Sequence, residues 1–588
     1  MFTRGRVFGL ACLVLFAAGS AWAQNGDVTQ PPVNPDEPHA QPSADAGFPS
    51  TPASVTGGEE GKIKFSSQTI LVQAPVIVTD KAGNHVHGLT KQNFHIFENG
   101  KEQKVATFEE IVASDQQLPV IPPRPGEFTN LTLSDQHPRS ITVIALDMLN
   151  TPFLSQANSR HELVRYLADN IDSKQVLALM IITSRGVKVV QGLTGDREQL
   201  IQLLKKTGGD LTAMLGLGPD TQANAAVGDV PELPTNLSRP FVAAAQATAH
   251  GDTLSAQVLQ QQAIEQTLNG FLEIAWFLSG VPGRKSLIWA TGGFPFEIST
   301  AAQLPGGYLS PLYERTMQAL DAAQISVYPI DARGLVGTDS SAAVVSSTGP
   351  ELAHQVANRT QFQQSLIDTL NEFADITGGK AFYNTNDLAS SFKRAADDGT
   401  SYYLVGYYLD THNRNSGWRG LKVKLDRKDL DVRSREGFFV TKATMDLEAT
   451  RTSDLNFALT SPIEGTGVPL SVKWLGTSGE GAKRKSDFII HMPPGGVSIA
   501  GSNGQKRLNF EFAASAYASD GKTGKAVVTI DRSVNLTVPE SQIATVMANG
   551  IDMKNVLELS PGQYVVRIVI RDNVTGKIGS VTAPLTVN

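Results

Sequence analysis

Polar side chains that could bind a ligand stand directly after two apolar runs of the sequence. Ser140–Leu146 is short and apolar, as a strand buried on both faces of a parallel sheet would be. Asp147, Asn150 and Thr151 follow this run. Thr291 follows a second run of the same kind. Ligands of a doubly wound sheet bind beyond the carboxyl ends of its strands. The sequence therefore predicts a ligand-binding site formed by Asp147, Asn150, Thr151 and Thr291.

The same residues also have a structural interpretation. Asp147 and Thr151 could cap the following helix and hydrogen-bond the loop. Asn150 could bond either the loop backbone or a ligand, and the sequence does not separate these two roles. For Asp331, which ends another predicted strand, we expect a salt bridge or a loop contact rather than ligand binding.

Motifs of common enzyme classes are absent from the sequence or incomplete in it. No Gly-x-Ser-x-Gly turn occurs, so the usual serine-hydrolase nucleophile is missing. His161-Glu162 begins like a zinc-protease helix, but Arg165 stands where the second histidine must be. Gly521-Lys522-Thr523 resembles the end of a phosphate-binding loop, but Ala516 replaces its first glycine. We therefore expect a protein that is not an enzyme.

Strand and helix patterns alternate between residues 136 and 400. Apolar runs typical of buried strands recur at 176–182, 286–290 and 325–330, and segments with helical spacing separate them. This alternation predicts an α/β domain, a doubly wound sheet with helices on both faces. Val187–Val190 is expected to add an edge hairpin. Residues 216–256 interrupt the alternation with glycine, proline and small polar residues, which indicates a flexible insertion or a functional loop.

Strand patterns also flank the α/β region on both sides. Alternation with period two occurs at 63–112 and again at 401–442. We predict that strands from these two segments combine into one sandwich, with the α/β domain inserted between them. Residues 446–588 consist of strand and turn patterns throughout, which predicts a separate C-terminal β-sandwich.

Three phrases of the sequence carry a resemblance to a known family. They are Val78–Lys101, Val327–Leu335 and Ile376–Asn384. In this order they resemble the VWFA-related domain family of secreted bacterial proteins, described mainly from Acidobacteria, which contains a von Willebrand factor A-type (VWA) domain. The resemblance covers roughly residues 65–440. It implies a Rossmann-like VWA domain flanked by β-sandwich domains, and protein binding or adhesion at the top of the VWA sheet.

The resemblance also implies a metal site. VWA domains typically hold Mg²⁺ through oxygen ligands, and a carboxylate of the partner completes the coordination. Asp147 matches the family's first aspartate, Thr151 its last serine and Thr212 the threonine of its second loop. Leu149 stands where the middle serine belongs, and Gly292 stands where a second aspartate belongs. The resemblance therefore implies a degenerate metal-ion-dependent adhesion site, weak or absent, which would take Mg²⁺ if it binds any ion.

The first residues indicate export. Arg4 and Arg6 precede an apolar run over residues 7–19, and Ala21-Trp22-Ala23 has the small residues that signal peptidase recognises. We expect a cleaved signal peptide and a periplasmic, cell-surface or secreted protein, with no membrane span in the mature chain. Cys12 is the only cysteine, so the mature chain would contain no disulfide. The net charge of −7 gives no general attraction to nucleic acid.

The predicted organisation has six parts: a signal peptide at 1–23, a disordered Pro-rich linker at 24–62, an N-terminal β domain at 63–135, the VWA domain at 136–400, strands at 401–442 that pair with the N-terminal β domain, and the C-terminal β-sandwich at 446–588. We expect an exported binding or adhesion protein whose partner is an extracellular or envelope protein or peptide. The alternative is a structural component of a cell-envelope assembly with no metal-dependent binding.

Overall fold

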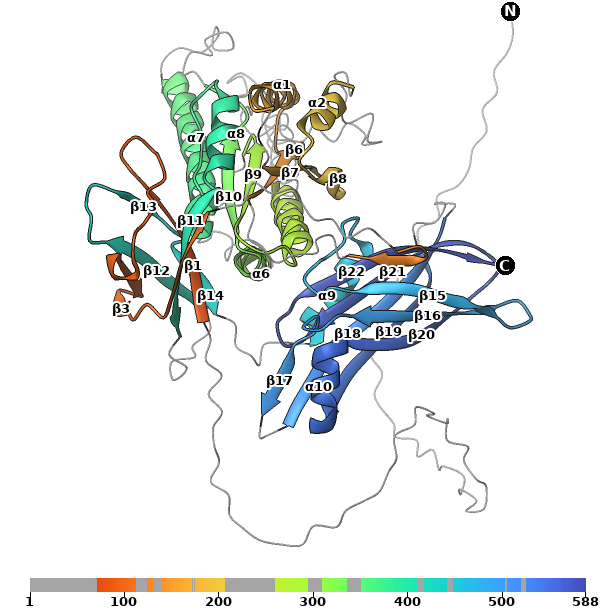
Figure 1. Ribbon diagram of the computed structural model, residues 1–588. Helices are drawn as coiled ribbons and strands as arrows, with labels where there is room; N and C mark the ends of the chain where they lie inside the picture. The colour runs from red at the N-terminus through yellow and green to blue at the C-terminus, as the bar shows by residue number, and fades with distance from the viewer. Residues whose placement is uncertain are drawn as a thin grey trace, which may run out of the picture. The chain divides into compact units, whose positions relative to one another are not determined.

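A computed structural model describes most of the chain beyond residue 70 (Figure 1). The described residues are 71–112, 124–130, 140–171, 173, 175–206, 260–293, 309–335, 350–409, 417–440, 448–502, 505–519 and 525–588. The predicted signal peptide, the Pro-rich linker, the insertion at 216–256 and Thr212 lie outside them.

A mixed five-stranded sheet forms the centre of the α/β region, with strand order β10-β9-β6-β7-β8. β6 (Ile141–Asp147), β7 (Val176–Thr183), β9 (Lys285–Thr291) and β10 (Ile325–Asp331) run parallel, and β8 (Gly186–Thr194) is antiparallel to β7. Every residue of the four parallel strands is buried. This burial on both faces explains why these strands are continuous apolar runs in the sequence.

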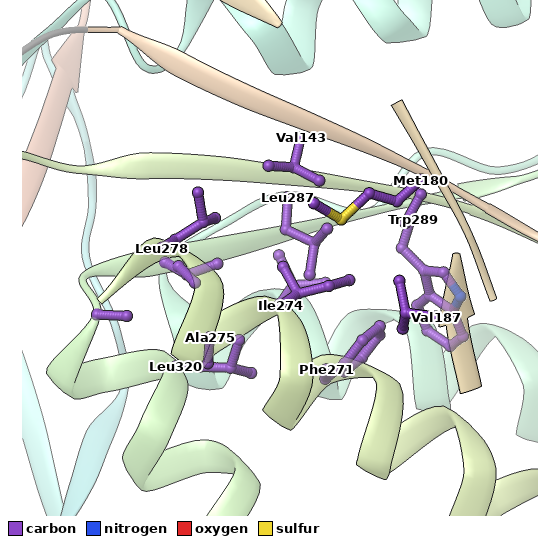
Figure 2. Close-up of a cluster of buried hydrophobic side chains, with 14 of the residues drawn as sticks. Val143, Met180, Val187, Phe271, Ile274, Ala275, Leu278, Leu287, Trp289 and Leu320 are labelled. Atoms are coloured by element: carbon purple, nitrogen blue, oxygen red, sulfur yellow. The ribbon is translucent and has the colours of Figure 1, made fainter. Parts of the chain in front are cut away.

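Helices cover both faces of this sheet. One face packs against the helix over residues 260–278, α6 (Leu309–Ala322) and α7 (Pro350–Thr377). The other packs against α1 (Phe153–Asp169), α2 (Arg197–Lys206) and α8 (Leu388–Asp397). Figure 2 shows the first core, where Leu287 and Trp289 of β9 meet Phe271 and Ile274 of the 260–278 helix. Among the described residues, no helix is long and apolar enough to span a bilayer.

Strands from before and after the α/β region pair with each other. One sheet has the order β13-β1-β11-β4 and the other β14-β12-β2-β3, and a shared apolar core lies between them. β1 pairs antiparallel with β11, and β2 with β12. The strands are β1 (Leu71–Thr79), β2 (Phe94–Glu98), β3 (Lys101–Gln103), β4 (Thr107–Val112), β11 (Ser401–Tyr408), β12 (Gly417–Leu425), β13 (Asp431–Arg433) and β14 (Gly437–Val440).

The C-terminal region contains two further sheets around one apolar core. The first has the order β20-β16-β15-β5, and the second has β17-β18-β21-β22 with β19 paired to β18. The strands are β5 (Glu127–Thr129), β15 (Ser471–Ser478), β16 (Arg484–Met492), β17 (Ile499–Ser502), β18 (Gln505–Ala518), β19 (Ala526–Val538), β20 (Ile551–Leu559), β21 (Gly562–Asp572) and β22 (Ile578–Val587).

Two features differ from the expectations drawn from the sequence. β5 was expected in the N-terminal β domain at 63–135, but it pairs with β15 instead. Asn130 fixes this short strand, because its amide donates to the carbonyls of Gly465 and Val468 and accepts from Leu470 N. The region 446–588 also contains α9 (Glu448–Thr460) and α10 (Glu540–Asn549), although only strands and turns were expected there.

Candidate functional site

The carboxylate of Asp147 is the centre of a buried hydrogen-bond network at the end of β6. Its Oδ1 accepts from the backbone N–H groups of Leu149 at 3.0 Å and Asn150 at 2.9 Å. Its Oδ2 accepts from Asn150 Nδ2 at 2.8 Å, Trp289 Nε1 at 3.0 Å and Thr291 Oγ1 at 2.7 Å. All five donors are neutral groups of the protein. An ionised carboxylate offers about four lone-pair positions, so these donors occupy its acceptor capacity.

The register of the sheet explains why Trp289 and Thr291 reach the same carboxylate. Ala145 of β6 lies beside Trp289 of β9, and side chains two positions apart share one face of a strand. Asp147 follows Ala145 by two residues, just as Thr291 follows Trp289. The indole N–H and the hydroxyl therefore both lie beside the Asp147 side chain on this face.

Asn150 and Thr151 connect the loop after β6 to two other elements. Asn150 Nδ2 also donates to Thr267 Oγ1 at 2.9 Å, which ties the loop to the 260–278 helix. Thr151 Oγ1 accepts from Gly292 N at 2.9 Å, which ties it to the loop after β9. Gln156 Nε2 donates to Thr151 O at 2.7 Å and holds the loop against the first turn of α1. Hydrogen bonds thus hold the loop to the 260–278 helix, to the loop after β9 and to the first turn of α1.

Gly292 lies where no larger residue fits. A Cβ atom added at this position would come within 2.4 Å of Asn150 O and 2.9 Å of Pro152 Cδ. Neither neighbour can yield easily, because one is backbone and the other is a proline ring. The position at which the family resemblance implies a second aspartate is therefore sterically closed to a larger side chain.

These observations decide whether a divalent cation fits the site. Mg²⁺ requires near-octahedral oxygen coordination at about 2.0–2.1 Å. The Asp147 oxygens are already surrounded by N–H and O–H donors, whose hydrogens point at the place an ion would take. Among the described residues, no group of three or more His, Cys, Asp and Glu side chains could hold a metal. The described residues therefore do not fit the Mg²⁺ that the family resemblance implies.

Burial and hydrogen bonding act in opposite directions on Asp147. Burial raises the pKa of its carboxyl above the usual range, and the bonds from Asn150, Thr291 and Trp289 lower it. Asp147 is 1% exposed, Asn150 and Thr151 are each 4% exposed, and Thr291 is fully buried. A partner that docks on the surface cannot contact these side chains directly.

Asp331, at the end of β10, has a separate partner. Arg333 donates to both of its carboxylate oxygens, from Nε to Oδ1 at 2.9 Å and from Nη2 to Oδ2 at 2.7 Å. The same guanidinium reaches Gln363 Oε1 of α7 at 3.0 Å. This is the salt bridge and loop contact expected for Asp331.

The structure thus brings together four of the predicted residues, which are Asp147, Asn150, Thr151 and Thr291. Thr212, the expected ligand from the second loop, lies outside the described residues. Sequence reasoning missed two members of the network, Trp289 and Thr267. Trp289 shares its face of the strand with Thr291, but only the register of β9 against β6 shows that its N–H reaches Asp147. Thr267 gave no signal, because it lies on a helix more than a hundred residues away from Asn150 in sequence.

No family model matches the chain, and no curated protein matches it. Among solved structures it is similar to proximal thread matrix protein 1 from the mussel byssus, with 11% sequence identity and a TM-score of 0.21. The alignment covers 44% of this chain and 48% of the mussel chain.

Proposed function

We propose that the chain is an exported VWA-type protein that binds a protein partner at the carboxyl edge of its parallel sheet without a divalent cation. The observation that carries this proposal is the closed Asp147 network. In an adhesion site the equivalent oxygens would face an ion and the partner's carboxylate. Here they accept hydrogen bonds from Asn150, Trp289 and Thr291, so the site stabilises the loop instead. The resemblance in sequence supports the VWA assignment.

The surface around the network supplies the contacts that we propose for the partner. Leu149, two residues after Asp147 in the sequence, is partly exposed, and Pro152 is exposed. Leu335 follows β10 at the same edge of the sheet and is 59% exposed. Apolar side chains at the rim of a rigid scaffold are suited to protein binding, which is driven chiefly by apolar burial. The buried network would hold these loops in a fixed conformation before the partner arrives.

Two measurements test this proposal. The first is calorimetry of the purified chain with Mg²⁺, Mn²⁺ and Ca²⁺, compared with Asp147→Asn. We expect the two titrations to agree, and an ion-binding heat that Asp147→Asn abolishes would overturn the metal-independent mechanism. The second is capture of envelope and culture-medium proteins on the immobilised chain, with Mg²⁺ and with EDTA. The same partner should be retained in both conditions.

Surface variants locate the binding face. Leu149→Asp and Leu335→Asp should abolish capture, because a charge at the centre of an apolar contact must be desolvated. Val527→Asp is the matched control, since Val527 is 51% exposed on β19 of the C-terminal sandwich. The reverse result, with capture lost only in Val527→Asp, would support the alternative function. In that case the β-domains would be the adhesive surfaces of an envelope assembly.

A further inference from the structure

A groove lies between α6, the end of α7 and the strands β12 and β14, and none of the residues lining it belongs to the Asp147 network. Its volume is roughly 420 Å³. Pockets that hold small ligands have volumes of about 300–1,000 Å³, so the groove is large enough for a long side chain and its flanking backbone.

Aromatic side chains form one wall of this groove. Trp418 is 42% exposed, although its ring packs edge-on against Phe439 with ring centroids 5.0 Å apart. Gly437 leaves the room for the indole, because a Cβ atom there would come within 2.2 Å of Trp418 Cζ2. Phe439 in turn packs against the core beneath α6 and α7. The indole is therefore an exposed aromatic surface that is held in one orientation.

Apart from Ile376, carboxylates form the rest of the lining, namely Glu314, Glu372, Asp375 and Glu436. No lysine or arginine is among the described residues that line the groove. Within the described part of the chain, Glu314, Asp375 and Glu436 form no ion pair. The groove thus concentrates negative charge beside an aromatic wall.

Hydrogen bonds hold the acidic segments in place. Glu436 N donates to Asp375 O at 3.0 Å, which joins the strand side of the groove to the end of α7. Tyr313 donates from its hydroxyl to Glu372 Oε1 at 3.3 Å, which joins α6 to α7. Burial raises the pKa of Asp375, the neighbouring Glu436 carboxylate raises it further, and Arg433, which does not line the groove, lowers it.

We propose that this groove binds an arginine side chain presented by a basic segment of a protein partner. A guanidinium is planar and always charged, so it can stack on the Trp418 indole while it donates to the carboxylates at its edge. A lysine ammonium can pair with the carboxylates, but it is a compact charge with strong hydration and cannot stack as a plane. A neutral or acidic ligand would leave the negative charge uncompensated.

A tetra-arginine peptide with blocked termini is the probe for this proposal, with tetra-lysine and tetra-glutamate peptides as controls. Binding to the purified chain is measured by calorimetry at low and at high salt. We expect tetra-arginine to bind more tightly than tetra-lysine, tetra-glutamate not to bind, and the affinity to fall as salt screens the charges. Equal binding of the arginine and lysine peptides would overturn the assignment of a stacked guanidinium.

Variants separate the groove from general surface charge. Asp375→Asn combined with Glu436→Gln should weaken tetra-arginine binding about fivefold, as the loss of exposed ion pairs does. Asp552→Asn combined with Glu558→Gln removes the same charge from exposed positions on β20, and this variant should bind like the wild type. An equal loss in both would show non-specific attraction and refute the groove.

Trp418→Ala tests the aromatic wall and should also weaken binding about fivefold. Unchanged affinity in a folded Trp418→Ala protein would refute stacking. Near-ultraviolet circular dichroism checks the fold. If Trp418→Ala does not fold, Trp418→Leu keeps an apolar side chain, and its affinity for tetra-arginine tests stacking in the same way. These outcomes are independent of the partner captured at the carboxyl edge of the sheet, so either proposal can fail alone.

Discussion

The hydroxyl of Thr291 donates a 2.7 Å hydrogen bond to Oδ2 of Asp147. Thr291 ends β9 and Asp147 ends β6, so this bond joins two neighbouring parallel strands at their carboxyl ends. The same hydroxyl accepts from Gly293 N at 2.9 Å. Side chains that could have faced a ligand therefore hydrogen-bond each other. These hydrogen bonds stabilise the carboxyl edge of the sheet.

Replacement of Asp147 by alanine should destabilise the α/β region strongly. The change removes the acceptor of five hydrogen bonds, and each buried donor left unsatisfied costs about 1–3 kcal/mol before relaxation. We expect a loss of about 3–5 kcal/mol in the free energy of unfolding. Urea unfolding followed by far-ultraviolet circular dichroism measures the loss. Asp552→Ala, at an exposed carboxylate, is the control and should leave the midpoint unchanged.

Gly292→Asp, which introduces the carboxylate that the family resemblance implies at this position, should not create a metal site. The new Cβ would come within 2.4 Å of Asn150 O, so the loop must move. Overpacking of this kind costs about 1–3 kcal/mol. We therefore expect a lower melting temperature and no gain in Mg²⁺ affinity. Gly192→Ala is the matched control, because a Cβ there meets nothing within 4 Å. Stabilisation of Gly292→Asp by Mg²⁺ would contradict this prediction.

The sequence predicted the strands of the parallel sheet because a strand buried on both faces is a continuous apolar run. β6, β7, β9 and β10 are continuous apolar runs, and a polar residue at the end of such a run can only lie at an edge. That reasoning placed Asp147 and Thr291 together. Strand patterns on both sides of the α/β region predicted that 63–112 and 401–442 contribute to one sandwich, but not which strands pair; in the structure β1 pairs with β11.

Contacts between distant residues gave no such signal. Trp289 lies within an apolar run, and only the register of β9 against β6 shows that its N–H reaches Asp147. β5 is three residues long, which is too short for a periodic pattern, so its pairing with β15 could not be predicted. α9 is rich in Thr, Ser and Asp, and its helix is stabilised by packing of Leu455 and Leu459 beside Trp276. Tertiary packing of this kind overrides weak local propensity.

The stability of the protein should depend on pH through Glu273, on the 260–278 helix. Burial raises the pKa of this carboxyl to about 7, from the usual 4.5. Between these two values the folded state keeps a proton that the unfolded state has released. Stability therefore falls as pH rises through this window, by about 3 kcal/mol at most, and the contribution is constant above and below it.

Glu273→Gln isolates this effect, because glutamine can still accept the 3.0 Å hydrogen bond from Val187 N but does not titrate. The variant should match the wild type near pH 4.5 and become the more stable protein as pH approaches 7. Urea midpoints measured from pH 4.5 to 8.5 give the difference. A difference that does not change with pH would show that Glu273 titrates normally. Glu558→Gln, at an exposed position of β20, should show no such trend.

The pairing of the two distant strand segments can be tested through a buried ion pair. Arg419 of β12 donates to Glu98 of β2, and both side chains are less than a tenth exposed. Glu98→Ala leaves a buried guanidinium without its counter-charge, which should lower the free energy of unfolding by about 3–5 kcal/mol. Combined replacement, Glu98→Leu with Arg419→Met, removes both charges and should restore most of that loss.

Lys81 and Asp431 supply the matched control, because they join the same two segments at 2.5 Å but are more than half exposed. Water and salt screen an exposed pair, so Asp431→Asn should leave the unfolding midpoint unchanged. Urea unfolding of the single and double variants gives the coupling energy between Glu98 and Arg419. If Glu98→Ala proves as harmless as Asp431→Asn, the two side chains are not buried against each other, and the pairing of β2 with β12 must be different from the one described.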